Sequence, residues 1–350
     1  MLASTTLLAS LCGTAACVHS AVYTHRIEAA HPEAGQLIDV NGHDVHVLTA
    51  GETGPPVLMI HGASANAREF SWTLAPRLQD AHRVFMADRP GHGHSERPPD
   101  GHQLGVQAAQ MAGTLNALVA DEPAVVVGHS FGGAVALRLA LDHPGKVKAL
   151  VLSAPVSHDW GGGGEAWYNA YAAPPVTGHV FSQLVPIVGP RSAQSGVLNV
   201  FDPAPAPEDY YEKSAIGLLF RPPSFRANAR DVQFLRAEIA AQQDRYPSLA
   251  MPIVVFSGAG DTVIKPSLHV GRLKHEAQDL TLVALPDEGH MPHHGEGAAM
   301  ADTIARLARG ERPAIGKRYT GSDDDPHTEP GANADSKPHN KPLATTPGAG

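Results

Sequence analysis

The sequence predicts an α/β fold with a mostly parallel central sheet of about eight strands, flanked by helices. Short apolar runs alternate with segments of helical spacing, and this order favours parallel strands joined by right-handed crossovers. The runs Pro56–Ile60 and Pro252–Phe256 contain no charged or hydrogen-bonding side chain, as expected of strands buried on both faces. In addition, Ser130 stands between an apolar run and a helical segment, with a glycine two residues before and after it. Functional groups are therefore expected at the carboxyl ends of the strands.

The first 22 residues are interpreted as a signal peptide, a lipoprotein signal or a membrane anchor. Residues 1–18 carry no charge, and four leucines give them an apolar core. Small residues precede Cys17, which makes this cysteine the candidate for acylation in a bacterial lipoprotein signal. No basic residue precedes the apolar run, and about 18 uncharged residues reach only the short limit for crossing a membrane. We expect an exported or membrane-associated protein, with a cytoplasmic protein as the alternative.

Residues 36–155 are expected to form the first part of the core. Asn41-Gly42 joins two alternating runs and predicts a hairpin. The next strands are predicted at Pro56–Ile60, Arg83–Ala87, Ala124–Val127 and Val147–Leu152, with helical segments ending near Leu78 and spanning 103–119 and 134–141. Residues 250–310 supply the second part, with strands Pro252–Phe256 and Leu280–Leu285. Residues 312–350 contain few apolar side chains, so we expect a disordered tail.

Residues 156–249 interrupt the alternation after the sixth strand and are predicted to form a helical cap over the site. This segment holds twelve of the 19 aromatic residues: Trp160, Trp167, Tyr168, Tyr171, Phe181, Phe201, Tyr210, Tyr211, Phe220, Phe225, Phe234 and Tyr246. We take Trp160, Trp167 and Tyr168 as candidates for lining a substrate pocket. The alternative is that most of these rings form the cap's own core.

Composition excludes several classes of function. The formal net charge of -9 leaves no basic face to neutralise phosphates, so no nucleic-acid partner is expected. The 21 histidines include no H-E-x-x-H pattern, so we expect them mainly on the solvated surface and expect neither a metal nor another cofactor.

Ser130 is the predicted nucleophile, because a serine hydroxyl at a tight strand-to-helix turn is presented for attack. Its proton must be accepted by an imidazole that a carboxylate orients. Asp261 and His290 each lie a few residues past the end of a predicted strand, and the order Ser130, Asp261, His290 fits this chemistry. The alternative candidates are Asp159, Asp287 and Glu288 for the carboxylate that orients the imidazole, and His293 and His294 for the general base.

The oxyanion of such a reaction needs two backbone N–H donors. We expect them from Phe131, at the amino end of the helix after Ser130, and from Ala63, in the loop after Pro56–Ile60. His61 and His129 lie near this site and are taken as pocket candidates with packing and hydrogen-bonding roles rather than roles in proton transfer.

These motifs, in this order, resemble those of the α/β-hydrolase superfamily over residues 36–310. The matching stretches are His61-Gly62, Asp88–Ser95, Gly128–Gly133, Gly260-Asp261 and Gly289-His290. The resemblance implies the α/β-hydrolase fold in its branch with a serine nucleophile and a cap. Epoxide hydrolases and haloalkane dehalogenases of this superfamily use an aspartate nucleophile, and Ser130 disfavours both.

The sequence therefore predicts a serine hydrolase that cleaves a small to medium apolar ester through an acyl-enzyme. One alternative is hydrolysis of a carbon–carbon bond, or cofactor-free perhydrolysis, on the same triad. The stretch His61–Asn66, followed by Phe70, is similar to the oxyanion loop of the carbon–carbon hydrolase and epoxide hydrolase branches. Another is a non-catalytic ligand-binding module that retains the fold.

Overall fold

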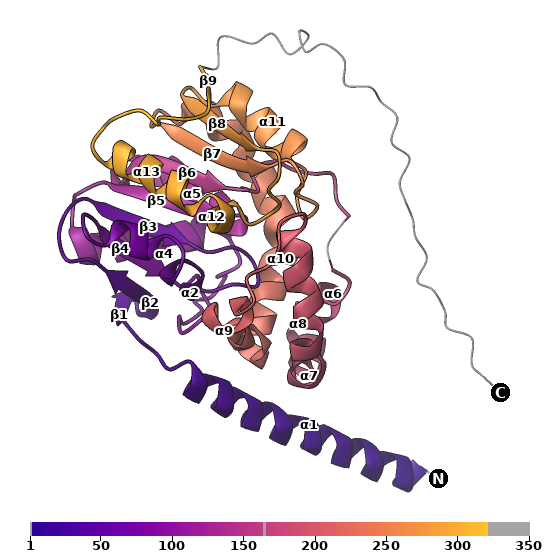
Figure 1. The fold of residues 1–350 in the computed structure, drawn as a ribbon. Helices are drawn as coiled ribbons and strands as arrows, with labels where there is room; N and C mark the ends of the chain where they lie inside the picture. The colour runs from indigo at the N-terminus through magenta and orange to yellow at the C-terminus, as the bar shows by residue number, and fades with distance from the viewer. Residues whose placement is uncertain (1, 164–165, 321–350) are drawn as a thin grey trace, which may run out of the picture.

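The computed structural model describes residues 2–163 and 166–320 and shows a central sheet between two layers of helices, with further helices covering one end (Figure 1). The sheet has nine strands in the order β1-β2-β4-β3-β5-β6-β7-β8-β9. They are β1 (Gln36–Val40), β2 (His43–Ala50), β3 (Pro56–Ile60), β4 (Arg83–Ala87), β5 (Ala124–His129), β6 (Val147–Ser153), β7 (Ile253–Gly258), β8 (Leu280–Leu285) and β9 (Lys317–Tyr319). The six strands from β3 to β8 pair in parallel, whereas β1, β2 and β9 pair antiparallel. The predicted fold class is confirmed.

Alternation along the central strands divides the core into two layers. Leu58 and Ile60 of β3 pack with α4 (Leu104–Val119), α5 (Phe131–Asp142) and α11 (Pro266–Glu276) on one face. Val57 and Met59 pack with α2 (Arg68–Ser71), α3 (Ala75–Leu78) and α13 (Gly297–Ala308) on the other. Successive side chains of a strand point to opposite faces, so a run of apolar residues fills both layers at once. This explains why the unbroken runs predicted the strands well.

The segment after β6, for which the sequence predicts a cap, consists of helices. Its elements are α6 (Asn169–Ala172), α7 (Pro175–Ser182), α8 (Val185–Phe201), α9 (Tyr210–Lys213), η2 (Ile216–Phe220), α10 (Pro222–Gln242) and η3 (Gln243–Ser248). Phe201, Tyr210 and Phe225 belong to a separate apolar cluster of the cap. Further along α10, Leu235 and Ile239 join the cluster on the sheet. Most cap aromatics therefore stabilise the cap itself, and α10 connects it to the core.

The first helix, α1 (Leu2–Ala30), continues past residue 22, where the predicted leader ends. Its second half contacts the cap: the Tyr23 hydroxyl donates to the Gly217 carbonyl oxygen at 2.9 Å, and Glu28 pairs with Arg221 at 2.8 Å. Among the described residues, no helix has the length and apolar character needed to cross a membrane.

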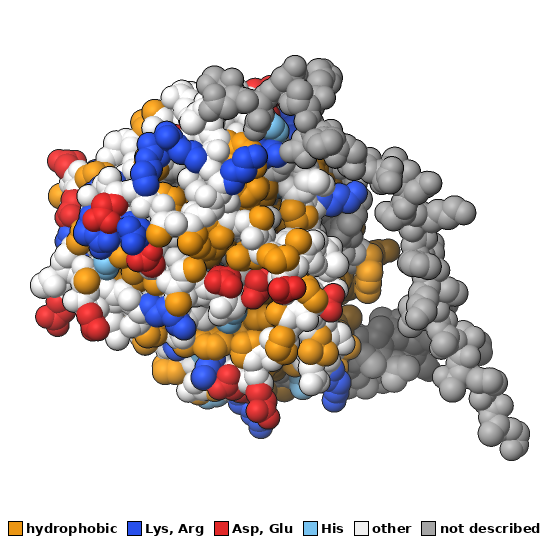
Figure 2. All heavy atoms as spheres, turned by 45° about the horizontal axis from the view of Figure 1, so that its top comes forward, with side chains coloured by type: hydrophobic (Ala, Val, Ile, Leu, Met, Phe, Trp, Pro, Cys, Tyr) orange, Lys and Arg blue, Asp and Glu red, His pale blue; other side chains and the backbone are white. Residues whose placement is uncertain are grey.

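The predicted tail begins too early. Lys317–Tyr319 forms β9, which pairs with β8, and the Tyr319 ring is buried against the sheet. These residues are ordered by backbone pairing with a neighbouring strand, which their polar composition did not reveal. Residues 321–350 of the predicted tail lie outside the described residues. On the face shown in Figure 2, acidic and basic side chains are interspersed and form no single basic surface.

Candidate active site

Ser130 lies at the sharp turn between β5 and α5. Its φ of 51° is in the left-handed region, which a residue with a Cβ adopts only under strain. The two flanking glycines permit this turn, because a Cβ at Gly132 would overlap the Ile60 carbonyl oxygen and one at Gly128 would lie 2.6 Å from the Gly132 carbonyl oxygen. The turn holds the hydroxyl at the carboxyl edge of the sheet, where Ser130 is 8% exposed.

The structure brings Ser130, His290 and Asp261 into one hydrogen-bonded chain. The Ser130 Oγ lies 2.9 Å from His290 Nε2, and His290 Nδ1 lies 2.7 Å from Asp261 Oδ2. The other oxygen of Asp261 accepts the backbone N–H groups of Val263 and Ile264 at 2.8 and 3.0 Å. Because the fixed carboxylate requires the His290 proton on Nδ1, Nε2 is left as an acceptor for the serine proton.

None of the alternative candidates occupies these positions. Asp159 pairs with Arg236 at 2.7 Å, and Asp287 is exposed. Glu288 is half-buried and is not hydrogen-bonded to the His290 ring. His293 and His294 both contact a different carboxylate, that of Glu69. The geometry thus favours Asp261 and His290 for the two roles.

Arg89 aligns the loop that carries the predicted oxyanion donor Ala63. Its fully buried guanidinium donates to the carbonyl oxygens of His61 at 3.1 Å and Gly62 at 3.0 Å. The peptide group is planar and trans, so the Ala63 N–H points opposite to the Gly62 carbonyl and away from Arg89. The guanidinium also lies 4.1 Å from the centroid of the Phe131 ring, next to the second predicted donor. Sequence reasoning did not identify Arg89, although it lies within the quoted Asp88–Ser95 motif.

His61 and His129 are buried and lie beside the triad. His61 Nδ1 donates to the Gly62 carbonyl oxygen at 2.8 Å, and its Nε2 accepts the Arg89 backbone N–H at 2.9 Å. His129 Nε2 donates to the His290 carbonyl oxygen at 2.9 Å. Burial holds the pKa of each ring well below its usual value, so both are neutral near pH 7. These contacts correspond to structural roles.

The three aromatic pocket candidates have different surroundings. Trp160 packs against the sheet cluster, and its Nε1 donates to the Gly163 carbonyl oxygen at 3.1 Å. Trp167 is 70% exposed, and Tyr168 packs against the Phe225 ring within the cap. Trp167 therefore does not line an enclosed pocket, and its ring contacts the rings of Tyr171 and Phe181 at the surface of the cap. Its aromatic character alone did not show this.

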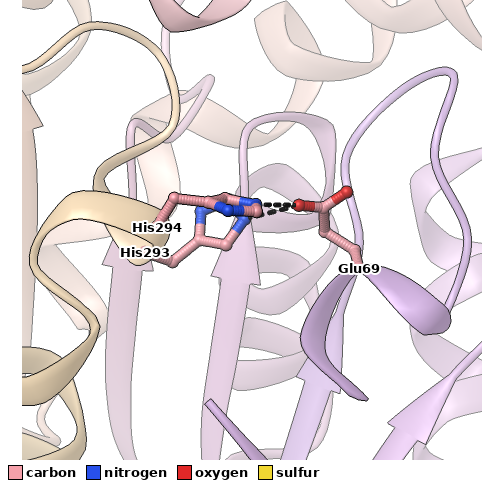
Figure 3. A group of neighbouring side chains, drawn as sticks. All are labelled: Glu69, His293 and His294. Carbon is pink, nitrogen blue, oxygen red and sulfur yellow. Dashed lines mark hydrogen bonds and ion pairs between the residues drawn. The ribbon is translucent and has the colours of Figure 1, made fainter. Parts of the chain in front are cut away.

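Glu69, His293 and His294 form a polar cluster, in which Glu69 and His293 are buried and His294 is partly buried (Figure 3). The rings of His293 and His290 both pack against His129, so this cluster lies beside the triad. Glu69 Oε1 lies 3.0 Å from His293 Nε2 and 2.6 Å from His294 Nε2, and Glu69 Oε2 accepts the Tyr210 hydroxyl at 2.8 Å. Burial alone would raise the pKa of Glu69, but the hydrogen bonds from both histidines hold it well below its usual value. These donor atoms are close enough together to hold a metal ion. The carboxylate is nevertheless satisfied by three hydrogen-bond donors, so the cluster is stable as a hydrogen-bonded network.

The expectation that the histidines lie mainly on the solvated surface does not hold for nine of them. Nine of the described histidines are buried: His46, His61, His82, His92, His129, His158, His269, His290 and His293. Five of them, His46, His82, His92, His158 and His269, were not singled out as candidates. The partners of two of these lie far away in the sequence, as Asp88 does from His46 and Glu276 from His158. The only local signal was the pair His293-His294, directly after Met291-Pro292.

Comparisons with known proteins agree with this architecture. The family model of the α/β hydrolase fold matches residues 55–177. A 2-hydroxymuconate semialdehyde hydrolase from Pseudomonas sp. (strain CF600) is 40% identical over 124 residues, which are 35% of this chain and 43% of that protein. The chain spans less than half the length of the first curated relatives that it matches.

Two solved structures share the fold over most of the chain. Epoxide hydrolase CorEH has a TM-score of 0.66 and 18% identity, and the match covers 79% of this chain and 99% of that one. An esterase from Exiguobacterium antarcticum has a TM-score of 0.61 and 19% identity, with 79% and 100% covered. At these identities the likeness concerns the fold.

Proposed function

The chain belongs to the α/β-hydrolase superfamily, and on this basis we propose that it is a serine hydrolase cleaving a small to medium apolar ester. The observation that supports this proposal most is the hydrogen-bonded chain from Ser130 through His290 to Asp261. In an epoxide hydrolase of this fold the nucleophile would be an aspartate, and here that position holds a serine.

The reaction proceeds in two halves. His290 Nε2 accepts the Ser130 proton while Oγ forms a bond to the ester carbonyl carbon. The N–H groups of Ala63 and Phe131 stabilise the oxyanion, and His290 then gives its proton to the departing alcohol. In the second half, His290 deprotonates a water that attacks the acyl-enzyme, the Ser130 oxygen regains the proton, and the carboxylic acid leaves.

Hydrolysis of a carbon–carbon bond is the second candidate. It is favoured by the 40% identity with the 2-hydroxymuconate semialdehyde hydrolase over 124 residues. The same triad and oxyanion donors would serve this reaction, with a carbanion in place of the alkoxide as leaving group. Cofactor-free perhydrolysis uses the same acyl-enzyme with hydrogen peroxide as the second nucleophile.

A fluorophosphonate probe and a substrate panel test these functions. Wild type, Ser130→Ala and the matched surface variant Ser192→Ala are labelled and then assayed with p-nitrophenyl esters of increasing acyl length. We expect labelling and turnover in wild type and Ser192→Ala, and a loss of at least about 10³-fold in Ser130→Ala. Equal turnover by all three would refute the serine mechanism. Turnover of 2-hydroxymuconate semialdehyde or of acetate with peroxide, but of no ester, would favour the alternatives, and tight apolar-ligand binding without turnover would favour a binding module.

We further propose that the N-terminal segment directs export or membrane association. The support is the uncharged stretch of residues 1–18 with Cys17 after small residues. Intact-mass measurement of protein from its native host distinguishes a lipid-modified chain beginning at Cys17 from an unmodified cleaved chain. A mass that includes Met1, with the protein in the cytosolic fraction, would contradict the proposal.

A further inference from the structure

A cavity of about 550 Å³ lies between α1, the Gly91–Arg97 loop and the start of α10. In Figure 1, α1 lies below the cap, which carries α10. Four arginines line the cavity: Arg97, Arg221, Arg226 and Arg230. Two glutamates, Glu28 and Glu96, are the acidic side chains in the lining. No residue of the triad belongs to this lining.

Two of the four arginines have acidic partners. Arg221 pairs with Glu28 at 2.8 Å, and Arg97 pairs with Asp231 at 2.6 Å. The carboxylate of Glu96 is directed elsewhere, since it accepts the Asp44 backbone N–H at 3.1 Å.

Arg226 and Arg230 have no carboxylate partner among the described residues. Their Nε atoms are buried and have no hydrogen-bond acceptor there. The side-chain contacts of Arg226 are to the His179 ring, with Nη1 2.9 and 3.0 Å from its two nitrogens. Burial, and then the charges of Arg230 and Arg97, lower the pKa of Arg226. The side of α10 that faces the cavity thus carries two uncompensated guanidinium groups.

This arrangement is unfavourable in the chain alone. Like charges four residues apart on a helix repel each other, and a buried donor without an acceptor loses its hydration without replacement. An anion between the two guanidinium groups would reverse both effects, because guanidinium donors match the oxygens of phosphate well. Thr24 and Ser224 also line the cavity, and their hydroxyl groups add neutral donors.

We propose that this cavity binds a phosphate-bearing ligand, with the phosphate held between Arg226 and Arg230. Several guanidinium groups around one cavity fit the many acceptor oxygens of a phosphate ester better than a single carboxylate. The volume exceeds that of a phosphate ion, so the cavity admits the group that carries it. Two sources share this chemistry: a soluble phosphate ester and the headgroup of an anionic phospholipid. The site is independent of the proposed ester hydrolysis.

The test uses the full chain in three forms: wild type, R226Q/R230Q and the charge-matched control R306Q/R309Q at the carboxyl end of α13. Binding of glycerol 1-phosphate is measured by calorimetry at constant ionic strength. Binding to phosphatidylcholine vesicles with and without phosphatidylglycerol is measured by co-sedimentation. We expect wild type and the control to bind equally and R226Q/R230Q to bind at least about tenfold more weakly. Loss in the calorimetric arm identifies a soluble ester, and loss in the vesicle arm alone identifies a lipid headgroup.

Thermal unfolding without ligand separates a binding role from a structural one. Removing two repelling charges should leave the melting temperature of R226Q/R230Q unchanged or raise it, as expected for residues placed for a ligand. A marked fall would assign both arginines to structure and overturn the proposal. Absence of binding by wild type in both arms, equal binding by R226Q/R230Q, or equal weakening in R306Q/R309Q would overturn it as well.

Discussion

Replacing Arg89 with methionine should damage stability and catalysis through separable effects. Arg89 joins three parts of the molecule: it donates to the carbonyl oxygens of His61 and Gly62, to Gln107 and to Asp231 of α10. Methionine keeps much of the aliphatic volume but removes the charge and the donors. We treat Arg89 as a positioning residue, because it acts on substrate only through the Ala63 N–H.

The cost to stability follows from the partners left behind. Breaking a buried ion pair by removing one member typically costs about 3–5 kcal/mol. Asp231 keeps a second partner in Arg97, at 2.6 Å, so we expect the lower end, about 3 kcal/mol. Catalysis should suffer because the Ala63 N–H loses its alignment. The loss of one oxyanion donor typically lowers kcat by about 10²-fold.

The double variant Arg89→Met/Asp231→Leu separates the two effects. It removes both buried charges and leaves only Arg97, whose side chain is partly exposed, without its carboxylate. Most of the lost unfolding free energy should therefore return, while the loop carbonyls still lack their donor. Urea unfolding followed by circular dichroism gives stability, and steady-state turnover of a p-nitrophenyl ester gives kcat and KM. We expect restored stability with kcat still about 10²-fold low and KM little changed. Recovery of kcat together with stability would refute an orienting role for Arg89.

Three further predictions concern stability and the turn at Ser130. Burial alone would raise the pKa of Asp88, but its hydrogen-bonded histidine holds it at about 2. Because the pKa of Asp88 is lower in the folded protein than in the unfolded chain, the ionised carboxylate stabilises the fold at pH values above about 4. This contribution of about 2 kcal/mol to the unfolding free energy should be lost as the pH falls from about 4 to about 2. A pH series of urea unfolding for wild type and Asp88→Asn checks this, and a constant difference would contradict it. Tyr210→Phe should cost about 1.5–3 kcal/mol in the same assay, because its hydroxyl donates to the buried carboxylate of Glu69; a cost near zero would show that water replaces it. Gly132→Ala should abolish labelling by a fluorophosphonate, since its Cβ would overlap β3, whereas Gly145→Ala has open space and should label normally.

Much of the fold could be predicted because short stretches of sequence identify the central strands. Each central strand is an apolar run whose alternate residues fill the two core layers, as Leu58 and Met59 do in β3. Asp261 and His290 could be selected as candidates because parallel strands bring their carboxyl ends to one edge. These inferences needed only short stretches of sequence.

The features that could not be predicted depend on contacts between segments that are distant in the sequence. Arg89 meets Asp231 across 142 positions, and Glu69 meets His293 across 224. The residues next to Arg89 and next to Glu69 in the sequence do not indicate that these two side chains are buried and paired. The contact of α1 with the cap is likewise one between distant segments, as between Tyr23 and Gly217.

Helix α10 belongs both to the cap and to the main core, and this limits how the chain could be re-engineered. Its early residues belong to the cap, Leu235 and Ile239 belong to the main core, and Asp231 between them holds the guanidinium under the oxyanion loop. Replacing residues 156–249 by the corresponding segment of a relative would also remove a support of the loop that carries the proposed oxyanion donor Ala63. A successful chimera therefore needs its junction placed before Asp231, or a donor segment with a carboxylate at that position. The cap of this chain is thus not an exchangeable module.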